Sequence, residues 1–411
     1  MSGLPQFFDV EIVGDAVPAP HPIDLKAQVS ESDGPTITPI GSRLYLDAST
    51  QKAWANNDMA AIVKEREQAA KDLSILYRNI EQGGENAWTK VKDAQSGKSY
   101  HLSWTDHTTM WCFVDKQPSG SDSTKTQDVV ISIGIYSKNA NTLGVSGYVW
   151  KNIPVAVPLD IISLVFVRWT GPLIREGITW TYEVAGKQLV EAAGDELAKL
   201  TEDSIAPSKG LSVAGVLCTL FPEALLPTNL PIRRQLLVVN VYNFDADHNW
   251  RSVMNHNDGG QVYNGEWKTD TVDPFAAGNK DHFPPGFTPA EESVSVVNCL
   301  SWAFQPDRVI FGLLGTAVFM SREDNKAGAA FKHASYILKD SEIGLEGVDG
   351  DTSEFDLELH YNADNWVKAQ SVEVQSGSYK MTGYTPNLGR PDDGISSYFV
   401  NIGLPPPVAS K

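Results

Sequence analysis

Short strand-like segments separated by turn residues fill most of the chain after about Tyr100, and this pattern restricts the fold more than any other feature. In Ile178–Val184, apolar side chains alternate with threonine and glutamate, which is the period of a half-buried β-strand. Similar segments recur in both halves and end in turns rich in glycine, asparagine and aspartate. Strands at this spacing are typical of antiparallel β-sandwiches.

One long helix is predicted in the first half, from about Asp58 to Gln82. Its apolar residues are spaced three and four apart, so they form one stripe that faces a core. Asn57 precedes this segment as an N-cap, and Gly83–Gly84 follows it as a stop signal. A further helix fits residues 187–200.

We therefore predict a mainly β fold with helical insertions (α+β), built from two antiparallel β-sandwich units and the long helix. Residues 1–232 would hold the first unit, with a helical insertion at about 186–226. Residues 233–411 would form the second unit, whose later strands are expected near Phe355–Tyr361 and Tyr379–Tyr384.

The second half also repeats the order of segments in the first. Leu236–Tyr242 matches Val129–Tyr136, and Val294–Trp302 matches Ile162–Trp169. The match lies in the pattern of residue types rather than in identity. A tandem duplication and a convergent strand–turn pattern both explain it.

Charge and hydropathy exclude several classes of partner. The 51 acidic residues outnumber the 33 basic ones, which gives a net charge of −18, so the phosphate field of a nucleic acid would repel the chain.

The longest apolar region has an uncharged core, 161–167, of seven residues, far short of the ~20 that span a bilayer. The N-terminus lacks the basic and apolar regions of a Sec signal peptide. We expect a soluble protein made in the cytoplasm, with non-classical release if it is a toxin.

Several segments of the second half resemble the β-sandwich of aegerolysins, sea-anemone cytolysins and fungal fruit-body lectins. They are Val239–Asn243, Gly265–Trp267, Pro284–Gly286 and Phe311–Phe319. The resemblance covers about Leu236–Leu404, and it implies recognition of a membrane lipid or a glycan and, in some members, pore formation. The chain differs from these families in its length and in lacking the basic balance of the anemone proteins.

A polar and aromatic segment between positions 245 and 267 is the candidate binding loop. Tryptophan and tyrosine rings can stack on a ligand, while the amides and the carboxylate form hydrogen bonds with it. The alternative is a long turn whose Asn and Asp side chains cap their own backbone. The candidate ligand-binding residues are Trp250, Asn255, Asn257, Asp258, Tyr263 and Trp267.

A short acidic loop is the best candidate for a calcium site in the sequence. Asp349, Asp351 and Glu354 supply carboxylate oxygens, which Ca²⁺ prefers, but their spacing is not that of an EF-hand. A solvated acidic turn is the alternative. No other cofactor is predicted.

Three cysteines, Cys112, Cys218 and Cys299, are too few for a disulfide framework. Cys112 could form a nucleophilic pair with His101 or His107, but it lies within an apolar strand pattern, which favours a buried, unreactive thiol. The sequence contains no P-loop, no nucleophile elbow and no zinc-protease motif.

These observations favour a non-enzymatic binding protein of cytolysin or lectin type, which recognises membrane lipid or glycan through aromatic loops. In a pore-forming toxin, residues 158–226 would be the segment that rearranges; otherwise this segment stays packed between the two units. Two alternatives stay open. One is a hydrolase whose carboxylates meet only in the folded chain, and the other is a structural protein that assembles into a homo-oligomer.

Overall fold

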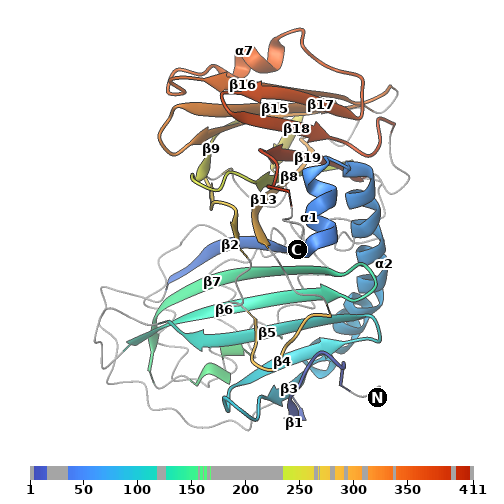
Figure 1. The fold of residues 1–411 in the computed structure, drawn as a ribbon, viewed down its shortest axis with the longest axis vertical. Coiled ribbons are helices and arrows are strands. Elements are labelled where there is room, and N and C mark those ends of the chain that lie inside the picture. Colours follow the sequence, from blue (N-terminus) through green and yellow to red (C-terminus); the bar gives the residue numbers. More distant parts are fainter. Residues whose placement is uncertain are drawn as a thin grey trace.

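The computed structural model describes a mainly β protein with few helices, which confirms the predicted fold class (Figure 1). Its strands belong to two sheets, one of 14 strands and one of five. The described residues are 4–15, 36–117, 126–155, 158–160, 162–163, 167, 235–262, 267, 269–277, 283–290, 295–307, 313–336, 339–389 and 395–407.

The large sheet runs through both halves of the molecule, in the order β1-β3-β4-β5-β6-β7-β2-β13-β8-β19-β18-β17. Two short strands, β10 and β12, also pair with β13. The N-terminal strands are β1 (Glu11–Asp15), β2 (Thr36–Leu46), β3 (Thr89–Lys92), β4 (Ser99–Trp104), β5 (Thr108–Lys116), β6 (Thr126–Ser137) and β7 (Thr142–Pro154). The C-terminal strands are β8 (Leu236–Asn243), β10 (Gly260–Val262), β12 (Ala276–Ala277), β13 (Ser295–Pro306), β17 (Ser371–Ser376), β18 (Tyr379–Tyr384) and β19 (Ile395–Ile402).

A five-stranded sheet, in the order β11-β9-β14-β15-β16, covers the C-terminal part of the large sheet and completes a sandwich there. Apolar side chains from both sheets, including Trp250, Val318, Phe331 and Val400, are buried between them. The strands of this second sheet are β9 (Trp250–Asp258), β11 (Thr271–Val272), β14 (Leu314–Arg322), β15 (Ala327–Ser335) and β16 (Glu342–Asp349).

The two halves of the chain are joined within the large sheet itself. Ser42–Leu46 of β2 pairs antiparallel with Ser295–Cys299 of β13, so an N-terminal strand continues the C-terminal sandwich. Backbone hydrogen bonds therefore join residues from both sides of the expected boundary near residue 233. No strand pattern in the sequence predicted this pairing.

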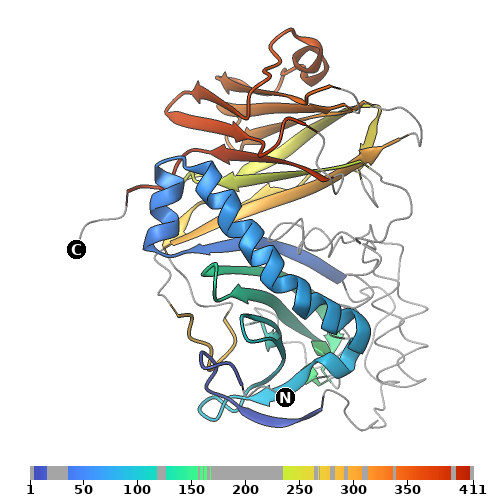
Figure 2. The same cartoon turned by 90° about the vertical axis from the view of Figure 1, so that its right-hand side faces the viewer.

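Two helices pack against this join (Figure 2). They are α1 (Ala48–Ala55) and α2 (Met59–Gly83), and the short 3₁₀ helix η1 (Gly84–Ala87) follows them. The long helix is confirmed, but its N-cap is Asp58, whose carboxylate accepts the amide of Ala61, rather than Asn57, which has a φ of 53°. α1 was not predicted, because it is too short to show a clear apolar period.

Aromatic side chains form the core on one face of the N-terminal strands, and a loop from the second half fills it. Phe287 lies among Phe8, Trp111 and Tyr136, with its ring centroid 4.9, 4.8 and 5.8 Å from theirs. The amide of Asp9 donates to the carbonyl of Gly286 at 2.8 Å, which ties the N-terminal segment to the same loop. Phe287 follows Tyr136 by 151 residues in the sequence, so the core of the first half is completed by a loop of the second.

Two segments that were predicted as strands are helical instead. The strand expected near Phe355–Tyr361 is replaced by a helix, α7 (Leu357–Asn362), whose N-cap Asp356 accepts the amide of Leu359. In the expected strand Ile162–Trp169, the described residues are helical, so this segment does not match β13 and the proposed repeat loses one of its pairs. Ile178–Val184 and the helical insertion at 186–226 lie outside the described residues.

Candidate binding site at one end of the C-terminal sandwich

The start of the predicted binding segment is a folded turn rather than an open loop. Trp250 is fully buried, and its indole nitrogen donates to Asp245 at 3.1 Å. Asp245 also accepts the backbone amides of Asp247 and His248, at 2.9 and 3.3 Å. Trp250 therefore belongs to the core, and the Asp side chain caps its own turn, as the alternative interpretation expected.

The second part of the segment, Asn255–Asp258, is the end of strand β9 and is half-buried to exposed. Asn257 pairs with Thr316 of β14, and Thr316 pairs in turn with His333 of β15. Residues directly opposite in an antiparallel sheet share a face, so these three side chains form one row. Val318 lies two residues beyond Thr316 on the same face of β14 and belongs to the sandwich core. The polar row therefore faces the inside of the sandwich.

The polar row consists of Asn257, Thr316 and His333. Hydrogen bonds connect two of these residues, Asn257 and Thr316, with each other and with Asn255. The amide of Asn257 donates to Asn255 at 2.6 Å, and Asn255 donates to Thr316 at 3.2 Å. Thr316 donates to Asn257 at 2.9 Å. Next to the row, Gln235 donates to Ser335, while its buried side-chain oxygen has no partner in the part of the chain that the structure describes. The end of the sandwich core is therefore lined by amides and hydroxyls instead of apolar side chains.

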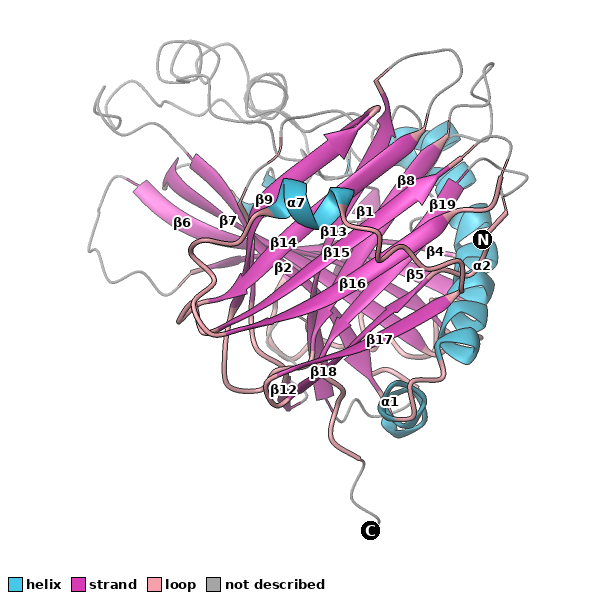
Figure 3. Cartoon of the chain, turned by 90° about the horizontal axis from the view of Figure 1, so that it is seen from above, coloured by secondary structure: helices cyan, strands magenta, loops and turns pink. Residues whose placement is uncertain are grey.

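The outward-facing residues of the same strand end contact α7, which lies across the outer face of the five-stranded sheet (Figure 3). His256 packs on Tyr361, with ring centroids 4.7 Å apart, and the Tyr361 hydroxyl donates to Asp258 at 3.3 Å. Trp366 meets Tyr361 edge-on at 5.2 Å. His256, Tyr361 and Asp258 thus lie on the outer face of the sheet, opposite the face that carries Asn255 and Asn257.

Lys332 positions α7 over the sheet. Its side chain is buried, and its ammonium donates to the carbonyls of His360, Tyr361 and Ala363 at 2.8, 3.3 and 2.9 Å. The same nitrogen lies 4.3 Å from the centre of the Trp366 ring. Burial lowers the pKa of Lys332 to about 8, so the ammonium is still mostly charged at neutral pH and complements the negative end of the helix.

We expect Lys332→Met to destabilise the C-terminal half by about 2 kcal/mol, because methionine fills a similar volume but leaves three carbonyls without their charged donor. Urea unfolding followed by circular dichroism measures this change. The control is Lys380→Met, which removes an exposed lysine that pairs with Glu373 at 3.0 Å and should change stability by less than about 0.5 kcal/mol. Equal effects of the two substitutions would contradict the capping role.

The remaining predicted ligand-binding residues are Trp267, which packs on the sandwich core, and Tyr263. Trp267 is half-buried and stacks on Trp302 with ring centroids 5.2 Å apart, where it covers the sandwich core. Tyr263 lies outside the described residues. Of the six candidates, the structure thus brings Asn255 and Asn257 together, whereas Asp258 lies on the other face of the same strand end.

The three carboxylates of the predicted calcium site do not converge. Asp349 accepts a hydrogen bond from Ser376, Asp351 accepts the amide of Ser353, and Glu354 is exposed. In the described parts of the chain, no group of three or more acidic, histidine or cysteine side chains is arranged to hold a metal ion.

Cys112 is buried beside His101, its partner residue on β4, and burial raises the pKa of its thiol to about 12. A thiol with this pKa stays protonated at neutral pH and is a poor nucleophile. His101 instead contacts the hydroxyl of Ser163 at 2.6 Å, and that hydroxyl also lies 3.3 Å from the Cys112 carbonyl. His107 is exposed in a turn, and Cys218 lies outside the described residues.

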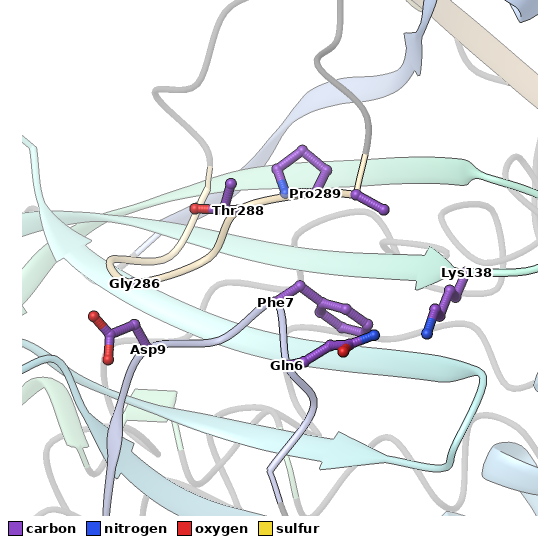
Figure 4. Close-up of a pocket in the computed structure, with 8 residues that line it drawn as sticks. Gln6, Phe7, Asp9, Lys138, Gly286, Thr288 and Pro289 are labelled. Carbon is purple, nitrogen blue, oxygen red and sulfur yellow. The ribbon is translucent and has the colours of Figure 1, made fainter.

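A pocket of about 310 Å³ lies in the N-terminal half, between the segment that precedes β1 and the loop that carries Phe287 (Figure 4). Asp9 and Lys138 stand on opposite sides of it, and both are exposed. Its remaining lining residues are Gln6, Phe7, Gly286, Thr288, Pro289 and Ala290. None of the predicted site residues contributes to this pocket.

Sequence reasoning missed Thr316 and His333, which complete the polar row at the end of β9, and Tyr361, which contacts Asp258 on the outer face. Each comes from a different element, so no local spacing connects them to Asn257. The detectable signal was His333 itself, an ionisable residue at an inward position of the apolar segment Ala327–Ser335.

No described helix combines the length and the apolar character that crossing a membrane requires. Neither a family model nor a curated protein matches this chain.

Proposed function

We propose that the protein is a non-enzymatic binding protein of lectin type, which binds a glycan at the end of the C-terminal sandwich. The observation that carries this proposal is the hydrogen-bonded group of Asn255, Asn257 and Thr316 at the end of the sandwich, where both asparagines are half-buried. Amide and hydroxyl groups can both donate hydrogen bonds to sugar hydroxyls and accept them.

The net charge supports a neutral ligand over an anionic lipid surface. With a charge of −18, approach to a membrane rich in anionic headgroups is electrostatically unfavourable. A glycan, either free or carried by a neutral glycolipid, does not meet this repulsion. The lipid-binding and pore-forming alternatives of the cytolysin type are therefore tested in the same experiment.

The test combines a glycan array with co-sedimentation on neutral vesicles, with and without glycolipid, sterol and sphingolipid. We expect Asn257→Ala to lower the affinity for the best glycan at least about tenfold, because it removes about 1.4 kcal/mol of hydrogen bonding. The matched control is Asn249→Ala, which removes a half-buried asparagine that contacts Glu323 at the opposite end of β9.

Binding of no glycan by the wild-type protein would contradict the proposal, as would equal affinities of the two variants. Sedimentation with plain vesicles, together with release of an enclosed dye, would favour the pore-forming alternative.

A further inference from the structure

His333 is an ionisable residue on the inward face of β15, where the residues before it are apolar. Ala329 and Phe331 lie before it on the inward face of β15, and the His333 side chain is fully buried. Among the described residues, neither ring nitrogen has a hydrogen-bond partner, whereas buried polar groups in folded proteins are nearly always paired. The site therefore accommodates a neutral imidazole and is poorly suited to a charged one.

The elements packed around this ring present uncharged groups to it. Thr316 of β14 and Ile343 of β16 are its direct neighbours in the sheet. Tyr398 of β19 lies across the sandwich, with ring centroids 5.7 Å apart, and its hydroxyl donates to the carbonyl of Gly344. On the same face of β15, Ser335 accepts a hydrogen bond from Gln235.

The nearby charges lie on the other face of the five-stranded sheet. Glu342 and Glu346 of β16 are paired with Ala334 and Ala330 of β15, one and three positions from His333, and therefore face outward. Lys332 and His360 belong to the same outer face, where Lys332 bonds the end of α7. Along the inward side of β16, Asp349 is six residues beyond Ile343, or about 20 Å. In the described parts of the chain, no counter-charge is placed to neutralise a protonated His333.

This environment links folding to protonation. Burial lowers the pKa of His333 to about 3, whereas histidine in an unfolded chain titrates near 6.5. Between these values the unfolded chain binds a proton that the folded chain does not. The contribution of His333 to stability is therefore complete above pH 6.5 and is lost progressively as the pH falls toward 3.

We propose that His333 is an acid trigger, which leaves the end of the C-terminal sandwich closed at neutral pH and opens it on acidification. Thr316 connects His333 directly to Asn257, so opening at His333 would separate the strands that hold the binding residues. The release of bound glycan rests on the proposed function, whereas the opening itself does not.

The experiment measures unfolding of the full chain without ligand, by urea titration followed by circular dichroism, at pH values from 7.5 to 4.5. Between pH 7 and pH 5 the unfolding constant of the wild-type protein should rise roughly twentyfold more than that of His333→Gln, which cannot be protonated. His107→Gln is the control, because His107 is exposed, and it should keep the wild-type pH dependence. His360→Gln separates the contribution of the histidine on the outer face.

A wild-type pH dependence in His333→Gln would overturn the proposal. If that variant does not fold, His333→Phe replaces it, and histidine NMR of the wild-type protein provides a measurement without substitution. The His333 resonance should not titrate in the folded protein between pH 7.5 and 4.5, and titration near pH 6.5 would overturn the proposal. These results do not depend on glycan binding, so the acid trigger and the proposed function can fail separately.

Discussion

Replacing Phe287 by alanine should destabilise the protein by about 3–5 kcal/mol, because the substitution empties the centre of the aromatic core of the N-terminal strands. Phe287 contributes a ring within 5.3 Å, centre to centre, of Phe8, Trp111 and Phe283. The surrounding rings come from separate strands and loops, so they cannot collapse into the cavity without moving the sheet.

Urea unfolding measures this loss, and tryptophan fluorescence follows the core directly because Trp111 is fully buried against Phe287. The matched control is Leu359→Ala on α7, where the side chain is 68% exposed and little stability should be lost. A loss below about 1 kcal/mol for Phe287→Ala would contradict the role of this loop as part of the N-terminal core.

The second large effect is expected from Gly134→Ala in β6. A methyl group on Gly134 would overlap the indole ring of Trp111, which is paired with Gly134 across β5 and β6 and fully buried. Because the ring has no free space to enter, either the indole or the strand must shift. We expect a destabilisation of at least about 3 kcal/mol, which is the upper range for overpacking in a core.

Gly389→Ala is the control for this substitution, since a methyl group at Gly389 meets no atom within 4 Å. The unfolding temperatures of the two variants, purified in parallel, are compared. The difference between them separates the effect of the clash with Trp111 from the general effect of replacing glycine. If both variants unfold at the same temperature, Gly134 is not needed for the approach of Trp111.

Both expected losses have a common origin in the way the two halves share one sheet. Phe287 follows β8 in the sequence but packs among strands of the first half, and β2 pairs with β13 of the second. A defect in the N-terminal core is therefore also transmitted to the edge of the C-terminal sandwich. The predicted division into residues 1–232 and 233–411 came from the order of strand patterns along the chain, which carries no information about pairing between distant strands such as β2 and β13.

Predictions from the sequence were most accurate where one element carries its own signal. The stripe of α2 identified a helix of nearly the right length, and the strand expected near Tyr379–Tyr384 is β18. They failed for α7, because a helix of six residues shows less than two full turns of periodicity. In the binding segment, Trp250 was expected at the surface because the sequence does not show that Asp245 receives its indole hydrogen bond.

The amino-acid sequence by itself determined the β-rich character of this protein, the position of its long helix and the repulsion of polyanions expected from its charge. These properties depend on residues close together in the chain or on a sum over all of them. The pairing of β2 with β13, the insertion of Phe287 and the row formed by Asn257, Thr316 and His333 were decided only by the tertiary structure. Such contacts depend on strand order and register, which bring together residues whose separation in the sequence carries no information about their distance in space.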